Sequence, residues 1–222
     1  MGVTKYLTTN LNTLMVLADN LSDNLTVEME FVPSMLSKNK NLSAGLYINV
    51  GQDHCYFFDP LTRMMCLPDQ AYKPGSWGYT DGKAYDSWPG NKSHDGKRKG
   101  VAANIYATNL EPVFQTFRMG LSGYQFDAPK GEYMVGLYFD EPFTNDEMKN
   151  IQRTGSSENF DRIFNVIINN ELVIDKLNLA AEFGHQTAVK KTFKITTNEG
   201  INIFLQALAG KPILSGVAIK KL

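Results

Sequence analysis

The chain has 222 residues, of which 43% are hydrophobic and 20% are charged, with a formal net charge of -1. This length and apolar content favour one domain with an extension, and they allow a proper core, so the chain need not be disordered. The near-neutral charge argues against nucleic acid or an anionic membrane as a partner. No apolar run approaches the roughly 20 residues that span a bilayer, and the first ten residues lack the apolar core of a signal peptide.

The first predicted unit is an N-terminal extension over residues 1–45. Apolar residues recur at helical spacing over residues 11–21, which predicts a short amphipathic helix. Residues 25–32 alternate between apolar and polar, as a half-buried strand does. The polar, proline-containing stretch 33–45 is typical of a linker. We therefore predict that the main domain covers residues 46–222.

From residue 46 onward the sequence predicts short strands at close intervals. Residues 113–119 alternate as a strand, and the turn at 127–131 is expected to join two strands as a hairpin. Asn169–Asn170 is typical of a two-residue hairpin turn, because asparagine tolerates left-handed conformations. Another turn is predicted at residues 198–200. Short alternating strands without a βαβ rhythm indicate an all-β fold, a β-sandwich of jelly-roll type.

Two cysteines, Cys55 and Cys66, flank a predicted turn that begins at Asp59–Pro60. A hairpin there would allow a single disulfide, as in an exported protein. Two buried free thiols fit the sequence equally well, so the cysteines leave the cellular compartment open.

The stretch 74–100 differs from the rest, because it is rich in glycine and aromatic residues and has no aliphatic run. A long connection without secondary structure inside a compact domain is usually functional or disordered. Its rings, Trp77, Tyr79, Tyr85 and Trp88, argue against disorder. Two interpretations remain: the rings form a ligand platform, or they cover the open end of the sandwich.

No sequence motif for catalysis or for a metal is present. There is no nucleophile elbow, phosphate-binding loop or zinc-protease motif, and His54, His94 and His185 are isolated from one another. Asp140 and Glu141 are adjacent on a predicted strand and so point to opposite faces, which prevents the pair from flanking one glycosidic bond. We predict no catalytic residue, no metal and no cofactor.

A sugar-binding site requires fewer specifically placed groups than an active site does. It needs an aromatic ring for the apolar face of a sugar and a few planar polar groups for the hydroxyls. Arg118 also has a purely structural interpretation, as a salt bridge on the sandwich face. The candidate ligand-binding residues are Trp77, Tyr79, Arg118, Tyr124, Asp140, Glu141 and Phe143.

Several blocks of the sequence resemble malectin or malectin-like domains. They are "INVG" near residue 48, "VFQTFRMG" and "GEYMVGLYFDEPF" in the middle, "RIFNVIINNELVID", and the closing "PILSGVAI". Because it contains "PDQAYKPGSWGY", the sequence is most similar to the malectin-like module at the C-terminal end of bacterial β-galactosidase-type glycoside hydrolases. The resemblance implies a galactose-binding-like jelly roll and a non-catalytic, carbohydrate-binding role. It also implies a catalytic domain of a parent hydrolase as partner, and a periplasmic or extracellular location.

The resemblance carries over unevenly to the family's ligand positions. The first loop tyrosine of the family matches Tyr79. The tyrosine after the family's "QT-x-R" motif falls on Met119, the aromatic pair after the strand end falls on Phe143 and Thr144, and the late aspartate has no acidic match near Lys211.

Two other functions stay open at this point. The domain could be a structural module that packs against a catalytic domain and binds no free sugar, with its rings buried at that contact. It could also be an independent hydrolase that uses Asp140 or Glu141, together with a further carboxylate that the sequence does not single out.

Overall fold

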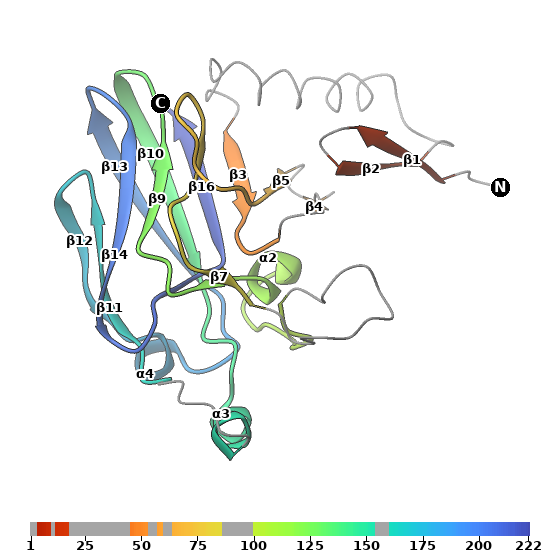
Figure 1. Cartoon of the computed structure of the whole chain (residues 1–222), viewed down its shortest axis with the longest axis vertical. Helices are drawn as coiled ribbons and strands as arrows, with labels where there is room; N and C mark the ends of the chain where they lie inside the picture. Colours follow the sequence, from red (N-terminus) through yellow and green to blue (C-terminus); the bar gives the residue numbers. More distant parts are fainter. Residues whose placement is uncertain are drawn as a thin grey trace.

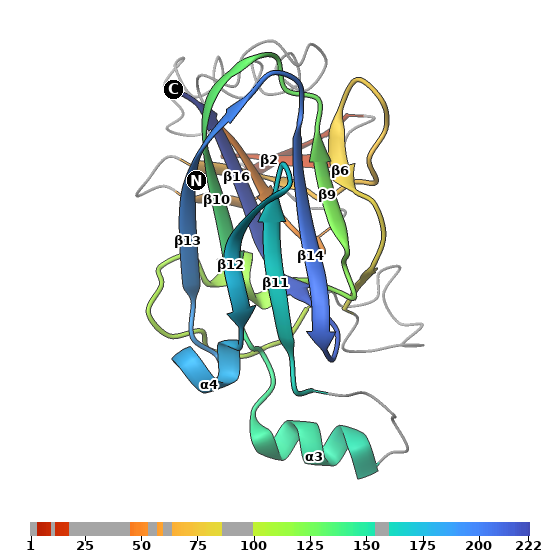
Figure 2. The ribbon, with the colours of Figure 1, turned by 90° about the vertical axis from the view of Figure 1, so that its left-hand side faces the viewer.

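The computed structural model describes residues 4–9, 12–17, 45–52, 57–59, 64–85, 100–153 and 160–222, with only the backbone placed in the first two segments. Two β-sheets lie face to face, and two short helices, α3 and α4, lie at one end of them (Figures 1 and 2). The predicted strand at 25–32 and the linker before residue 45 lie outside the described residues. The all-β sandwich predicted from the sequence is confirmed.

The larger sheet has six strands in the order β13-β10-β16-β3-β5-β4. All neighbours are antiparallel except β3 and β5, which run parallel. Its strands are β3 (Leu46–Asn49), β4 (Phe57–Asp59), β5 (Met64–Pro68), β10 (Gly131–Phe139), β13 (Val189–Thr197) and β16 (Gly216–Lys221).

The facing sheet has five antiparallel strands in the order β12-β11-β14-β9-β6, and a small third sheet has the order β15-β8-β7. The five strands are β6 (Trp77–Tyr79), β9 (Gly123–Phe126), β11 (Ile163–Ile168), β12 (Glu171–Leu177) and β14 (Ile201–Ala209). The small sheet contains β7 (Lys83–Ala84), β8 (Arg118–Met119) and β15 (Ile213–Leu214). The helices are α2 (Glu111–Gln115), α3 (Asn145–Arg153) and α4 (Leu179–Phe183).

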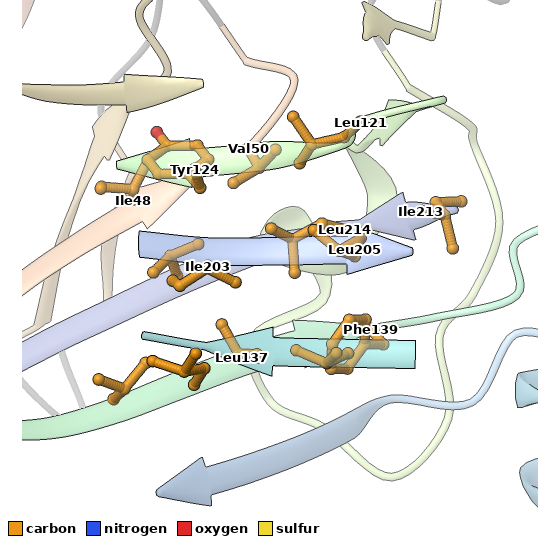
Figure 3. Packing of buried hydrophobic residues seen from close by; sticks show 14 of the residues in the cluster. Ile48, Val50, Leu121, Tyr124, Leu137, Phe139, Ile203, Leu205, Ile213 and Leu214 are labelled. Atoms are coloured by element: carbon orange, nitrogen blue, oxygen red, sulfur yellow. The ribbon is translucent and has the colours of Figure 1, made fainter. Parts of the chain in front are cut away.

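The core lies between the two large sheets and follows the period of two in the sequence. Every second side chain is buried along β11 and along residues 201–205 of β14, and these meet the inward side chains of β10 (Figure 3). The core includes Leu137, Phe139, Ile203, Leu205 and Tyr124, all almost fully buried. Alternating burial of this kind is what holds a sandwich together, because each apolar side chain removed from water contributes about 1.5–3 kcal/mol.

The six-stranded sheet is covered on its outer face as well. A second apolar cluster there contains Val113 and Phe114 of α2, together with Ile105 and Tyr138. Cys66 belongs to this cluster as a buried free thiol, and burial raises its pKa to about 12. The free-thiol alternative thus holds for Cys66, and Cys55 lies outside the described residues.

Three sequence predictions are corrected by the fold. The predicted helix is wrong over residues 12–17, which form β2 (Asn12–Leu17) and pair with β1 (Thr4–Thr9). These segments are rich in threonine, with a valine in β2, and β-branched residues favour extended pairing. The other residues of that predicted helix, 11 and 18–21, lie outside the described residues.

The predicted strand at 113–119 is wrong for its first half, which is helical in α2. Pro112 stands in the first turn of that helix, where a proline is tolerated, and the adjacent Val113 and Phe114 are both buried. Two adjacent buried side chains fit a helical turn against a sheet better than a strand with one covered face.

The turn at 127–131 is not a hairpin, because β9 and β10 belong to different sheets. The turn at 198–200 likewise carries the chain from β13 in one sheet to β14 in the other. By contrast, Asn169 and Asn170 do form the predicted hairpin turn, with φ of 48° and 69° between β11 and β12.

Gly51, directly after β3, provides a test of how tightly the end of the sandwich is packed. An alanine Cβ there would overlap the backbone of Phe117, and the φ of Gly51 is +83°. Gly75 has almost the same φ, +84°, but no atom within 4 Å of an added Cβ. We expect Gly75→Ala to lower the free energy of unfolding by about 1 kcal/mol, and Gly51→Ala to lower it by about 3 kcal/mol or more, in urea unfolding. Equal losses in the two variants would contradict the close approach of Gly51 to the backbone of Phe117.

Candidate functional site

The candidate site lies at one end of the sandwich, which we call the loop end. Strands β3, β5 and β10 run in the same direction through the six-stranded sheet, so their C-terminal ends lie together. Helices α3 and α4 are at this end (Figure 2). Four segments meet here: the segments that follow β3, β5 and β10, and the segment that precedes β11.

A buried ion pair, Arg118–Asp69, joins β8 to the segment that follows β5. Nε of Arg118 donates to a carboxylate oxygen of Asp69 at 2.9 Å, and both side chains are almost fully buried. The hydroxyl of Tyr124 and the backbone N–H of Gly51 donate to the same carboxylate at 2.8 and 2.9 Å. Burial raises the pKa of Asp69, and Arg118 and the two other donors oppose that rise.

Tyr79 is stacked on this ion pair. The guanidinium carbon of Arg118 lies 3.3 Å from the centre of the Tyr79 ring, as in a cation–π contact. Nη1 of Arg118 also donates to the carbonyl of Gly82 at 3.0 Å, so the arginine fixes both the ring and the turn that follows it. Tyr79 itself is half-buried. The ring is therefore held in one orientation while part of it reaches solvent.

A second buried ion pair, Arg162–Glu141, joins the segment before β11 to the end of β10. Nη1 of Arg162 lies 2.6 and 2.7 Å from the two carboxylate oxygens of Glu141, and the residues are 2% and 1% exposed. Burial raises the pKa of Glu141, and Arg162 opposes the rise. The guanidinium also lies beside the rings of Phe143 and Phe160, and Nη2 is 3.5 Å from Sδ of Met119.

Around this pair the aromatic residues form a packed cluster. The ring of Phe143 lies 5.0 Å from Tyr85, 5.9 Å from Phe117 and 5.5 Å from Phe160, in edge-to-face arrangements. Tyr85 is also stacked on Phe117 at 5.0 Å. Tyr85 is the half-buried member of the cluster, so it is the ring that this cluster presents to solvent.

Asp140 is fully buried between these features and the start of β13. Neither carboxyl oxygen has a well-aligned hydrogen-bond partner among the described residues. Burial and the neighbouring Glu141 raise its pKa to about 8, and the backbone N–H of Thr187 only partly opposes the rise. The raised pKa favours the protonated, neutral form of Asp140 near neutral pH.

The structure brings most of the candidate ligand-binding residues to one part of the fold, but it buries six of the seven. Trp77 is in the core, stacked on Tyr124 and Phe126 with ring centres 6.5 Å apart in each case. A buried ring has no face to offer a sugar in this conformation. The buried candidates are Trp77, Arg118, Tyr124, Asp140, Glu141 and Phe143. Their part in ligand binding stays a prediction, and Tyr79 is the one that reaches solvent.

Sequence reasoning missed Asp69 and Arg162 altogether. Each directly flanks a strand, where a charged residue normally faces water, so nothing local to the sequence marked either as buried. The structural interpretation of Arg118 was closer, because it does form a salt bridge, although a buried one. Tyr85 was noted as a loop aromatic but not as a site residue. Trp88, His54 and His94 lie outside the described residues.

Comparison with protein families identifies the domain. A family model of the malectin domain matches residues 46–215. The chain belongs to the malectin domain family. No curated protein matches the chain in sequence.

Solved structures agree with this assignment. The malectin domain described here is 31% identical to part of Bacteroides uniformis β-glucuronidase, with a TM-score of 0.65. The match covers 80% of this chain but only 18% of that enzyme. The extracellular domain of ANXUR2 from Arabidopsis thaliana (15% identity, TM-score 0.55) and the plant receptor-like kinase FER (15%, TM-score 0.52) share the fold. Each of these two matches covers 79% of this chain and 48% of the plant protein.

Within the described part of the malectin domain, no group of three or more His, Cys, Asp or Glu residues could hold a metal ion. Among the same residues, no helix has the length and apolar character that a membrane span requires. Asp69 and Glu141 are paired with buried arginines and Asp140 is closed off from solvent, whereas Asp161 in the segment before β11 is exposed.

The buried ion pair Arg162–Glu141 predicts a strong asymmetry between single and double substitution. Arg162→Met leaves an uncompensated carboxylate in the interior and should lower the free energy of unfolding by about 3–5 kcal/mol. Adding Glu141→Leu should recover most of that loss, because apolar side chains can replace a buried pair.

The exposed pair Lys194–Glu132, at 3.1 Å, is the matched control, and Lys194→Met should cost less than about 1 kcal/mol. Urea unfolding of the four proteins measures these differences. A double variant that is less stable than Arg162→Met would contradict the interpretation.

The raised pKa of Asp140 predicts a pH dependence of stability. The folded state holds this proton up to about pH 8, whereas the unfolded chain releases it above the ordinary value of 3.8. The folded state thus binds more protons over this range, and stability falls as pH rises from 4 to 8. Asp140→Asn removes this contribution. The variant should equal the parent near pH 4 and exceed it at pH 8, with each pKa unit contributing about 1.4 kcal/mol at most.

Chemical unfolding of both proteins at pH 4, 6 and 8 measures the difference. Curves that run parallel over the whole range would show that Asp140 is ionised in the folded protein.

Proposed function

We propose that this domain is a non-catalytic, carbohydrate-binding accessory module of a larger glycoside hydrolase. Three observations support the proposal: membership of the malectin domain family, a 31% identity to part of a β-glucuronidase, and the braced ring of Tyr79 at the loop end. The proposal depends most on the braced ring of Tyr79. The parent enzyme that we propose is of the β-galactosidase type that the sequence resembles.

The geometry of Tyr79 suits a sugar. Arg118 covers one face of the ring, which also packs against the hydrophobic core and stays half-buried. A pyranose needs an aromatic face for its C–H groups and planar polar partners for its hydroxyls. A ring that is already held in place loses little conformational entropy when a ligand stacks on it. Tyr85, braced by Phe117 and Phe143, offers a second ring of the same kind.

Binding fits the loop end better than hydrolysis. Glycosidases need two carboxyl groups that flank the scissile bond and reach it. Here Asp69 and Glu141 are held by buried arginines, and Asp140 is fully enclosed. The same arrangement suits a module that binds a ligand without acting on it chemically. Its proposed partners are an oligo- or polysaccharide and the catalytic domain of the parent enzyme, in the periplasm or outside the cell.

The alternative function is a structural module that packs against the catalytic domain and binds no free sugar. Burial of six of the seven candidate residues favours it, because few rings then remain for a ligand. The two functions differ in one measurable respect, which is the affinity of the isolated domain for sugars.

Calorimetric titration of the domain with galactosides, glucosides, glucuronides and plant oligosaccharides tests the proposal. We expect one of these classes to bind, and Tyr79→Ala and Tyr85→Ala each to weaken that binding at least tenfold, because each removes a stacking face. Tyr106→Ala is the matched control, since Tyr106 is 65% exposed and has no ring contact in the described residues. No binding across the panel would leave the structural module as the function, and equal loss in all three variants would place the site elsewhere.

A further inference from the structure

The two sheets of the sandwich differ in what covers their outer faces. The six-stranded sheet carries α2 and the residues packed with it, so β16 is buried on both faces from Gly216 to Ile219. The five-stranded sheet has no such cover among the described residues. Its outer face looks toward the viewer in Figure 2, where no other described element lies over β11 and β14. Alternate residues of β14 are accordingly exposed.

An aromatic ring stands at the centre of this outer face. Phe204 on β14 is 44% exposed. The register places it opposite Ile167 on β11, which in turn lies opposite Leu172 on β12. These three side chains form one cross-strand row, roughly 10 Å long at about 4.8 Å per inter-strand step. On its other side Phe204 lies opposite Gly123, over which the side chain of Thr80 is placed.

The positions next to this ring are amides. Along β14, Asn202 and Gln206 precede and follow Phe204 on the same face, and across the strands Asn202 lies opposite Gln125. Nδ2 of Asn165 donates to Oε1 of Gln206 at 2.9 Å, which leaves the Gln206 amide group free to donate. The side-chain amides of Asn202 and Gln125 make no hydrogen bond within the described part of the chain.

The three strands that form the centre of this face contain no charged residue. The sequences of β9, β11 and β14 are GYQF, IFNVII and INIFLQALA. By comparison, β13 at the edge of the other sheet carries Lys190, Lys191 and Lys194. The charged residues of this sheet, Glu171, Asp175 and Lys176, lie on its edge strand β12, so the central strands offer no charge to the phosphates of a nucleic acid or to an acidic peptide. The centre of the face suits a ligand that is neutral and rich in hydroxyl groups.

We propose that this outer face is a second carbohydrate-binding surface that takes a neutral polysaccharide chain. Phe204 stacks on the apolar face of one sugar ring. Asn202, Gln125 and Gln206 bind hydroxyl groups beside it, and Ile167 and Leu172 lie under the next part of the chain. The surface is separate from the loop end and does not depend on Tyr79.

The composition of the face favours a glycan over a protein partner. A stable protein interface buries about 800 Å² on each partner around a closely packed apolar centre. The row of Phe204, Ile167 and Leu172 is bordered by amides that have unused hydrogen-bonding groups, and the next large apolar side chain on β14, Leu208, lies beyond Gln206. Burying such groups without partners under a protein would cost about 1–3 kcal/mol each, whereas sugar hydroxyls can satisfy them.

Affinity electrophoresis in gels that contain β-glucan, xylan or galactomannan tests the proposal. We expect the domain to be retarded by at least one of these, Phe204→Ala to weaken the interaction at least tenfold, and Phe204→Trp to retain it. Leu208→Ala is the matched control, because Leu208 lies on the same strand and is 48% exposed. Phe204 is a surface residue, so its substitution should leave the thermal unfolding temperature nearly unchanged.

The outcomes separate this proposal from the function proposed for the loop end. Retardation that Phe204→Ala removes and Tyr79→Ala leaves in place supports the second surface. Retardation or oligosaccharide binding that depends on Tyr79 alone overturns it and leaves the loop-end function standing. Equal effects of Phe204→Ala and Leu208→Ala also overturn it. So does a dimer in sedimentation velocity that Phe204→Ala dissociates, since the face would then bind a second copy of the chain.

Discussion

Two buried arginine–carboxylate pairs are the constraint on which the loop end of this domain depends. Arg118–Asp69 ties β8 to the end of β5, and Arg162–Glu141 ties the start of β11 in one sheet to the end of β10 in the other. Charges this deeply buried gain little net stability over apolar residues of similar size. Their effect is directional, because each guanidinium fits only one arrangement of its neighbours. The pairs therefore set where the loop segments lie and how Tyr79 and Phe143 are oriented.

The neutral state of Asp140 belongs to the same arrangement. Glu141 is ionised against Arg162, and a second negative charge directly beside it in the interior would have no cation to balance it. The proton that Asp140 keeps to about pH 8 removes that charge. The loop end thus places a carboxyl group paired with arginine next to one whose pKa burial raises to about 8. Because Glu141 is paired with Arg162 and Asp140 is enclosed, neither carboxyl group is free to act on a ligand.

The sequence predicts the sandwich better than it predicts the site. Period-two burial in β11 and β14 and the Asn169–Asn170 turn are local properties, so the fold class and that hairpin could be read from the chain. The turns at 127–131 and 198–200 could not be assigned to a hairpin or to a crossing between sheets, because the same turn residues serve both. The depth of Trp77 and Phe143 also escaped prediction, since a glycine-rich aromatic segment looks the same whether its rings face water or the core. Arg162 and Asp69 gave no signal, because their burial results only from the pairing of segments that are far apart in the sequence.

The family's ligand positions are partly rebuilt as structure in this chain. Met119 packs against Arg162, and Thr144, where the family has a second ring, caps α3 instead. The hydroxyl and backbone N–H of Thr144 both lie 2.8 Å from the carboxylate of Glu147, whose own N–H returns a bond to the hydroxyl at 3.3 Å, as in a capping box. A threonine engaged in this way cannot stack on a sugar. The rings that the packing still leaves partly accessible are Tyr79 and Tyr85 at the loop end and Phe204 on the uncovered sheet. Of the three, Phe204 can change without disturbing the interior, because it lies outside the buried core, whereas Tyr79 and Tyr85 also pack against that core.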